Sequence, residues 1–98
     1  MAKPSSKQQL QAKVGSLTLG KIQFTNKLRR PLIFELASSR ADLMLPTTEQ
    51  VSFRAQETQT LELDIFPQSK KGVGEVFLYV SDAEQYVQEC IALEILYA

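Results

Sequence analysis

The chain has 98 residues, enough for one domain, and 44% of them are hydrophobic, so a core can form. It contains one Cys and no His, which rules out an internal disulfide and removes the commonest metal ligand and general base. The start of the chain shows no secretory signal, and no apolar run is long enough to span a bilayer. We therefore expect a soluble, cytoplasmic chain.

Basic and acidic residues are equal in number, eleven of each, but they are unevenly distributed. Residues 1–40 hold eight Lys or Arg against Glu35 alone, whereas residues 41–98 hold three basic and ten acidic residues. Such an asymmetry could mark a basic arm for nucleic acid, or two sets of strands that neutralise each other in the fold. The choice between these two readings depends on the fold.

The first ten residues include Pro, Ser and Lys and show no hydrophobic periodicity. We expect residues 1–10 to form a disordered tail or linker, and residues 11–98 to form a single domain that is one module of a longer protein. An edge strand is expected within residues 12–19, where Gly15 interrupts the pattern.

Short alternating segments with turn signals between them continue along the chain and are predicted to be strands. They are residues 21–25, 31–38, 51–53, 60–66, 75–81 and 87–96. The last segment also has a composition that suits a helix, but "ECIALEIL" alternates and follows the turn-like "SDAEQ", which favours a strand. Seven short strands joined by turns predict an antiparallel β-sandwich.

The order of these segments also resembles a known family. "IQFTN" followed by "KLRRPLIFEL" is similar to that family's second and third strands, and "SSRADLML" is similar to its Ser-x-x-Pro-x-Leu-Leu loop, with Ala41 at the Pro position. "LELDIFP", "GVGEVFLYVSD" and "QECIALEILY" resemble its closing three strands. The family is the PapD-like immunoglobulin domain of the major sperm protein superfamily, and within it the pattern is most similar to repeated domains of a ciliary transition-zone scaffold.

This resemblance implies an all-β, seven-stranded antiparallel immunoglobulin-like sandwich, with strands A, B, E and D in one sheet and C, F and G in the other. It also implies a scaffolding role at a cilium, basal body or centriole, with no catalysis and no cofactor. We therefore expect a protein–protein interaction module whose partners are other proteins or neighbouring domains of the parent chain.

The outer face of the C–F–G sheet is predicted to be apolar, because Phe77 and Tyr79 occupy the positions that polar residues should fill in a strand with one wet face. Neighbouring strands add further apolar side chains to the same face, which is our predicted partner-binding site: Ile33, Ala37, Phe77, Tyr79, Cys90 and Ala92. The outer face of the other sheet is predicted to be polar and charged: Lys21, Gln23, Thr25, Ser52, Arg54, Thr60, Glu62 and Asp64. Exposed apolar patches of this kind mark interfaces, unless the N-terminal segment folds over them.

Two alternatives for partner binding remain open. The basic turn with Lys27, Arg29 and Arg30 could read an acidic peptide, as major sperm protein domains do. The topology, however, should bring this basic turn opposite an acidic turn with Asp82 and Glu84. The basic turn also lacks the aromatic side chains that nucleic-acid binding usually needs. An unpaired edge strand could instead accept a strand of a partner.

No segment predicts a catalytic or metal site. Glu62 and Asp64 share a strand face, but an outer face has no pocket to separate the pKa values of two carboxyl groups, and a hard cation needs more oxygen ligands. Cys90 has no His to serve as its base. We therefore predict no enzyme, no metal and no cofactor.

Overall fold

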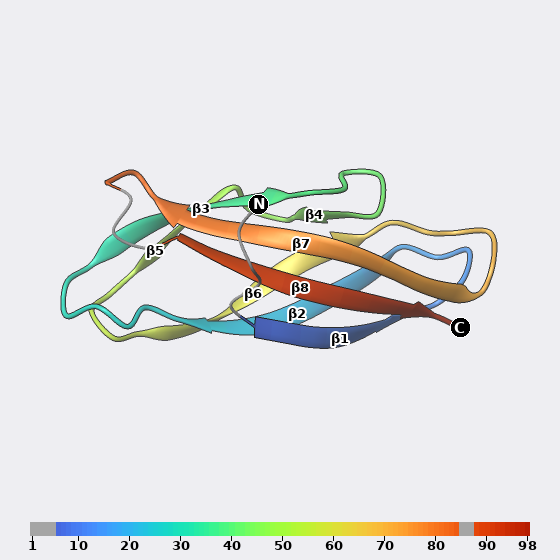
Figure 1. Cartoon of the computed structure of the whole chain (residues 1–98), viewed down its shortest axis with the longest axis horizontal. Helices are drawn as coiled ribbons and strands as arrows, with labels where there is room; N and C mark the ends of the chain where they lie inside the picture. Colours follow the sequence, from blue (N-terminus) through green and yellow to red (C-terminus); the bar gives the residue numbers. More distant parts are fainter. Residues whose placement is uncertain (1–5, 85–87) are drawn as a thin grey trace.

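A computed structural model describes residues 6–84 and 88–98, which form a two-layer β-sandwich of 43 × 25 × 17 Å (Figure 1). The described residues contain no helix, and hence none with the length and apolarity needed to cross a membrane. The strands are β1 (Ser6–Ala12), β2 (Thr18–Thr25), β3 (Leu32–Ser38), β4 (Met44–Pro46), β5 (Gln50–Phe53), β6 (Thr58–Ile65), β7 (Gly72–Asp82) and β8 (Gln88–Tyr97).

The larger sheet has five strands in the order β1-β8-β7-β3-β5, and the smaller has three in the order β2-β6-β4. Neighbouring strands are antiparallel except for β1, which runs parallel to β8. The predicted all-β sandwich is confirmed, with eight strands in place of seven. The helical alternative for the C-terminal segment is wrong, since β8 pairs with β7 along its whole length.

The expected division of strands between the sheets is wrong at two places. The N-terminal strand was expected beside the second strand, but β1 lies beside β8 (Figure 1). The fourth predicted strand, β5, pairs with β3 in the larger sheet, and the unpredicted β4 takes its place beside β6. β4 has only three residues, which is too short to give an alternating signal.

The N-terminal boundary also differs from the prediction. Residues 6–10 were expected in a tail, but they belong to β1, whose Leu10 packs against the core and whose Ala12 is buried in it. Residues 13–17, expected within a strand, form a turn, because Gly15 adopts a φ of +78° that reverses the chain there. The rest of the predicted tail, residues 1–5, lies outside the described residues.

The core lies between the sheets and is filled by the inward positions of both. Leu61, Leu63 and Ile65 of β6 point inward, as their alternation predicts. At one end, Phe24, Phe34 and Phe53 meet edge to face, with ring centroids 5.2–5.8 Å apart. Such pairs are worth about 0.5–1.5 kcal/mol each beyond the area they bury. This aromatic cluster supports the end of the sandwich that carries the candidate site.

Candidate interaction surface

The β2–β3 turn is fixed by one buried side chain, Asn26. Its Nδ2 donates hydrogen bonds to the carbonyl oxygens of Arg30 at 2.9 Å and Arg54 at 3.0 Å, and its Oδ1 accepts one from the N–H of Leu28 at 3.1 Å. The backbone N–H of Asn26 donates to the carbonyl oxygen of Glu57 at 2.9 Å. Asn26 therefore ties the β2–β3 turn to the β5–β6 turn, and an Asn directly after an alternating strand is the sequence signal for such a turn.

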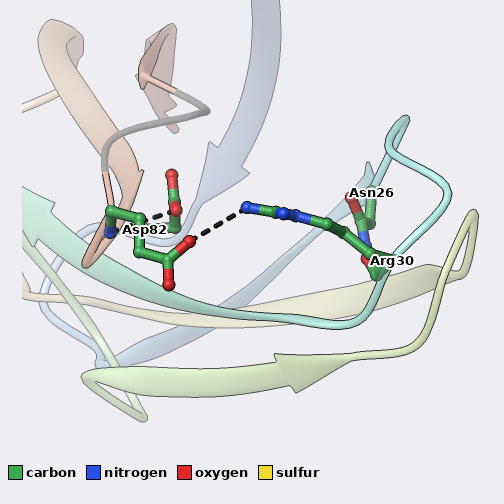
Figure 2. Close-up of polar contacts among 4 residues, drawn as sticks. Asn26, Arg30 and Asp82 are labelled. Carbon is green, nitrogen blue, oxygen red and sulfur yellow. Dashed lines mark hydrogen bonds and ion pairs between the residues drawn. The ribbon is translucent and has the colours of Figure 1, made fainter.

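The basic turn and the end of β7 face each other across this end of the sandwich, as the topology predicts. Figure 2 shows Arg30 extending from the β2–β3 turn toward the segment that holds Asp82. Its Nη2 lies 2.9 Å from Oε2 of Glu84, whose own N–H donates to Oδ2 of Asp82 at 3.2 Å. Both ion-paired side chains are about half exposed, so the pair contributes about 0–1 kcal/mol. Its main effect is to neutralise one charge of the basic turn.

Between these two segments lies an open groove of about 580 Å³. Its lining comes from the start of β3, from β5 and from the end of β7: Arg30, Pro31, Leu32, Ile33, Ser52, Asp82, Ala83 and Glu84. Ile33 is 56% exposed and lies opposite Ser52 in the β3–β5 pairing. The lining of the groove thus combines apolar side chains with charged ones.

The predicted face extends from this groove along β3 and β7, with the exposed Glu35 between Ile33 and Ala37 on β3. Ala37 lies opposite Tyr79, Tyr79 opposite Cys90, and Phe77 opposite Ala92, so these side chains share one face of the larger sheet. Tyr79 is 40% exposed, Ala37 is exposed and Phe77 is half-buried. The structure brings together the residues named from the sequence, although only some of them are accessible.

Cys90 and Ala92 do not present accessible surface, as the prediction assumed. They are 4% and 5% exposed, because both are small side chains on β8, which lies between β7 and β1. Burial also raises the pKa of the Cys90 thiol, which keeps it protonated at neutral pH and makes it a poor nucleophile. The accessible part of the face is therefore built from β3 and β7.

The outer face of the smaller sheet is less uniformly charged than predicted. Lys21 lies opposite Glu62, but Leu19 and Leu45 flank Asp64 and are 50% and 40% exposed. Ser52 and Arg54, predicted for this face, lie on and just after β5 of the larger sheet. Each sheet therefore has exposed apolar side chains on its outer face, Ile33 and Tyr79 on the larger sheet and Leu19 and Leu45 on the smaller. The two pairs are similarly exposed, so substitutions in one pair can serve as the control for substitutions in the other.

The edge of β8 is occupied by β1, so the edge-strand alternative no longer applies to β8. The edges of the larger sheet are β1 and β5, and those of the smaller sheet are β2 and β4. Within residues 6–84 and 88–98, no group of three or more Asp, Glu or Cys side chains is placed to hold a metal ion.

A family model for NPH4 Ig-like domain 4 matches residues 5–98. This is the group of repeated ciliary domains that the sequence pattern resembles, so that resemblance is confirmed. No curated protein sequence matches the chain significantly. Immunoglobulin-like domains of the major sperm protein and ASH families are generally non-catalytic.

Three solved structures illustrate the fold. WR4, a C. elegans MSP family member, has a TM-score of 0.62 and 13% identity, with 92% of each chain covered. The ASH or PapD-like domain 7 of human CEP192 has a TM-score of 0.61 and 8% identity, with 98% of this chain and 82% of that chain covered. The CupB2 chaperone of Pseudomonas aeruginosa has a TM-score of 0.68 and 9% identity over 91% of this chain, which spans 52% of the chaperone. These similarities show a PapD-like sandwich.

Proposed function

Since the chain belongs to the family of NPH4 Ig-like domain 4, we propose that it is a non-catalytic protein–protein interaction module of a ciliary, basal-body or centriolar scaffold. It acts in the cytoplasm as one domain of a longer chain. The observation that carries this proposal is the accessible apolar surface on the outer side of β3 and β7, next to the open groove.

The contact surface is formed by Ile33, Ala37, Phe77 and Tyr79. Cys90 and Ala92, predicted for the same site, lie beside it on β8 but are buried. Interface energy concentrates in a few aromatic or large apolar side chains that become fully desolvated on binding. Tyr79 suits this role because its ring is already partly packed and its hydroxyl can stay at the wet rim.

The partner is a protein segment that places an apolar side chain in the groove, against Ile33. The groove is open and has Ser52 on one side and the Arg30–Glu84 pair on the other, so polar groups of the segment can be hydrogen-bonded at its rim. Charge does not drive this association, because Glu84 already neutralises Arg30. We therefore expect binding that changes little between low and high salt.

The proposal is tested with two matched double variants of the chain. Ile33→Glu with Tyr79→Ser removes the β3–β7 patch, and Leu19→Glu with Leu45→Ser makes the same kind of change on the smaller sheet, at positions of similar exposure. Pull-downs from ciliated cells, quantified by mass spectrometry, will identify the proteins that wild type captures. The first variant should fail to capture these proteins, and the second variant should still capture them. Circular dichroism should show both variants folded, because all four side chains lie on outer faces.

A different outcome would favour one of the alternatives. If the β3–β7 variant keeps its partners while Lys27→Gln with Arg29→Gln loses them, the domain is an acidic-peptide reader that uses the basic turn. This alternative now depends on Lys27 and Arg29, because Arg30 is bound to Glu84. Loss of partners only when the outer edge of β1 is blocked would identify the edge-strand acceptor.

A further inference from the structure

A tyrosine hydroxyl is buried without a partner at the end of the sandwich opposite the β2–β3 turn. Tyr97, the last residue of β8, is 4% exposed, and its hydroxyl oxygen makes no hydrogen bond within the described part of the chain. Native proteins rarely leave a buried hydroxyl unsatisfied, and such a group calls for an explanation. Because burial raises the pKa of the Tyr97 phenol, the hydroxyl is protonated at neutral pH and can donate a hydrogen bond.

Tyr97 lines a pocket of about 310 Å³, formed by the β3–β4 and β6–β7 loops and the start of β7. Its lining includes three cationic side chains and no carboxylate: Arg40, Leu43, Gln68, Ser69, Lys70, Lys71, Gly72, Val73, Gly74 and Tyr97. We call this the Tyr97 pocket. Gly74 lets the ring lie close to the strand, since a Cβ there would be 3.3 Å from Cε2 of Tyr97 and 3.3 Å from Cδ1 of Leu43.

The charges around the pocket leave two cations available. Arg40 is held by Asp42, with its Nη2 2.8 Å from Oδ2 and its Nε 3.4 Å from Oδ1. The hydrogen bond from Arg40 lowers the pKa of Asp42, so this carboxylate stays ionised. Among residues 6–84 and 88–98, no carboxylate lies within ion-pair distance of Lys70 or Lys71. The pocket therefore carries a net charge of about +2 beside a hydroxyl donor.

We propose that the Tyr97 pocket binds a phosphate group, free or carried by a phosphorylated side chain. A phosphate monoester carries a charge of about −1.5 to −2 at pH 7 and has three strong acceptor oxygens. These match two ammonium groups and one hydroxyl donor. The β3–β4 and β6–β7 loops, which line this pocket, lie at the end of the sandwich opposite the β2–β3 turn (Figure 1). The proposed phosphate site is therefore separate from the proposed protein-binding face.

The test is a titration of the ¹⁵N-labelled chain, monitored by two-dimensional NMR, with inorganic phosphate and separately with O-phosphoserine. The ionic strength is kept constant, and a titration with sodium chloride is the control. The amides of residues 40–43, 68–74 and 97–98 should shift in a saturable manner. Tyr97→Phe should weaken binding roughly 10- to 150-fold, which corresponds to one lost hydrogen bond to a charged group. Lys70→Gln with Lys71→Gln should weaken it further, and Lys21→Gln, on the outer face of the smaller sheet, should leave it unchanged.

A pH series separates phosphate recognition from general attraction of anions. O-phosphoserine loses about one charge between pH 7.5 and 5.0, because its second pKa is near 6, whereas sulfate stays a dianion. Binding of O-phosphoserine should therefore weaken over this range while binding of sulfate does not fall. Equal affinity of Tyr97→Phe and wild type would overturn the proposal, and so would shifts spread over the whole surface that chloride reproduces.

Discussion

Replacing Asn26 with alanine should destabilise the protein more than any other substitution of a single polar side chain in the β2–β3 turn. The side chain is 0% exposed and makes three hydrogen bonds to backbone groups of Arg30, Arg54 and Leu28. Alanine would leave two carbonyl oxygens and one N–H without these partners. Arg30, in the same turn, also reaches a second segment, but through a half-exposed ion pair with Glu84.

The magnitude follows from those three bonds. A net contribution of about 1 kcal/mol for each gives a loss of about 3 kcal/mol, and more if water cannot reach the orphaned groups. Total stabilities of small domains are about 5–15 kcal/mol, so this loss is a large part of the whole. It should lower the melting temperature by roughly 12–24 °C for a domain of this size.

The assay is urea unfolding followed by circular dichroism, with Asn26→Asp and Gln23→Ala as companions. Asn26→Asp keeps the acceptor for the N–H of Leu28 but turns a carboxylate oxygen toward two carbonyl oxygens, so it should cost at least as much as alanine. Gln23→Ala, on the exposed face of β2, should change stability by less than about 0.5 kcal/mol. A loss below about 1 kcal/mol for Asn26→Ala would refute the assignment of Asn26 as the residue that holds both turns.

Three further predictions follow from single features of the fold. The pKa of Glu57 is lowered from its ordinary value of 4.5, chiefly by the hydrogen bond from the backbone N–H of Arg54, so its stabilising effect is present above pH 4.5 and is lost as the pH falls through the folded-state pKa. Urea midpoints measured from pH 6 to 3 should therefore fall more for wild type than for Glu57→Gln; parallel curves would contradict this. Gly20→Ala should cost about 1–3 kcal/mol in the same assay, because a Cβ there would lie 2.9 Å from Cδ1 of Ile65, and an unchanged midpoint would show that the core can shift to admit it. In phosphate-free buffer, Tyr97→Phe should raise stability by about 1 kcal/mol, since it removes an unsatisfied buried hydroxyl; a decrease would mean that the hydroxyl is hydrogen-bonded in solution.

The period-2 pattern was sufficient to predict most strands and their faces. Phe77 and Ala92, or Ala37 and Tyr79, could be assigned to one face because alternation fixes the side of the sheet to which each side chain points. β1 was not predicted as a strand because its outward residues are polar and only Leu10 and Ala12 reach the core. Its sequence therefore resembles that of a tail. The pairing of β5 with β3 depends on contacts between distant segments, which a local pattern does not contain.

In the candidate site, too, the features set by local alternation could be predicted, and those set by contacts between distant segments could not. Alternation placed Cys90 and Ala92 on the outer face, but their burial depends on the strands that flank β8, and one of these was not expected there. The Arg30–Glu84 contact could be anticipated from topology and charge. The Tyr97 pocket could not, because it joins two loops and the end of β8, segments that are far apart in the sequence.

The central claim is that this domain binds a protein partner through the outer face of β3 and β7. The most direct measurement is isothermal titration calorimetry of a captured partner against wild type and both double variants, at 50 and 300 mM salt. We expect Ile33→Glu with Tyr79→Ser to weaken binding by about 100-fold or more, as loss of two anchors of about 1.5 kcal/mol each requires, with little dependence on salt. An unchanged dissociation constant for this variant, or a loss confined to Leu19→Glu with Leu45→Ser, would contradict the account.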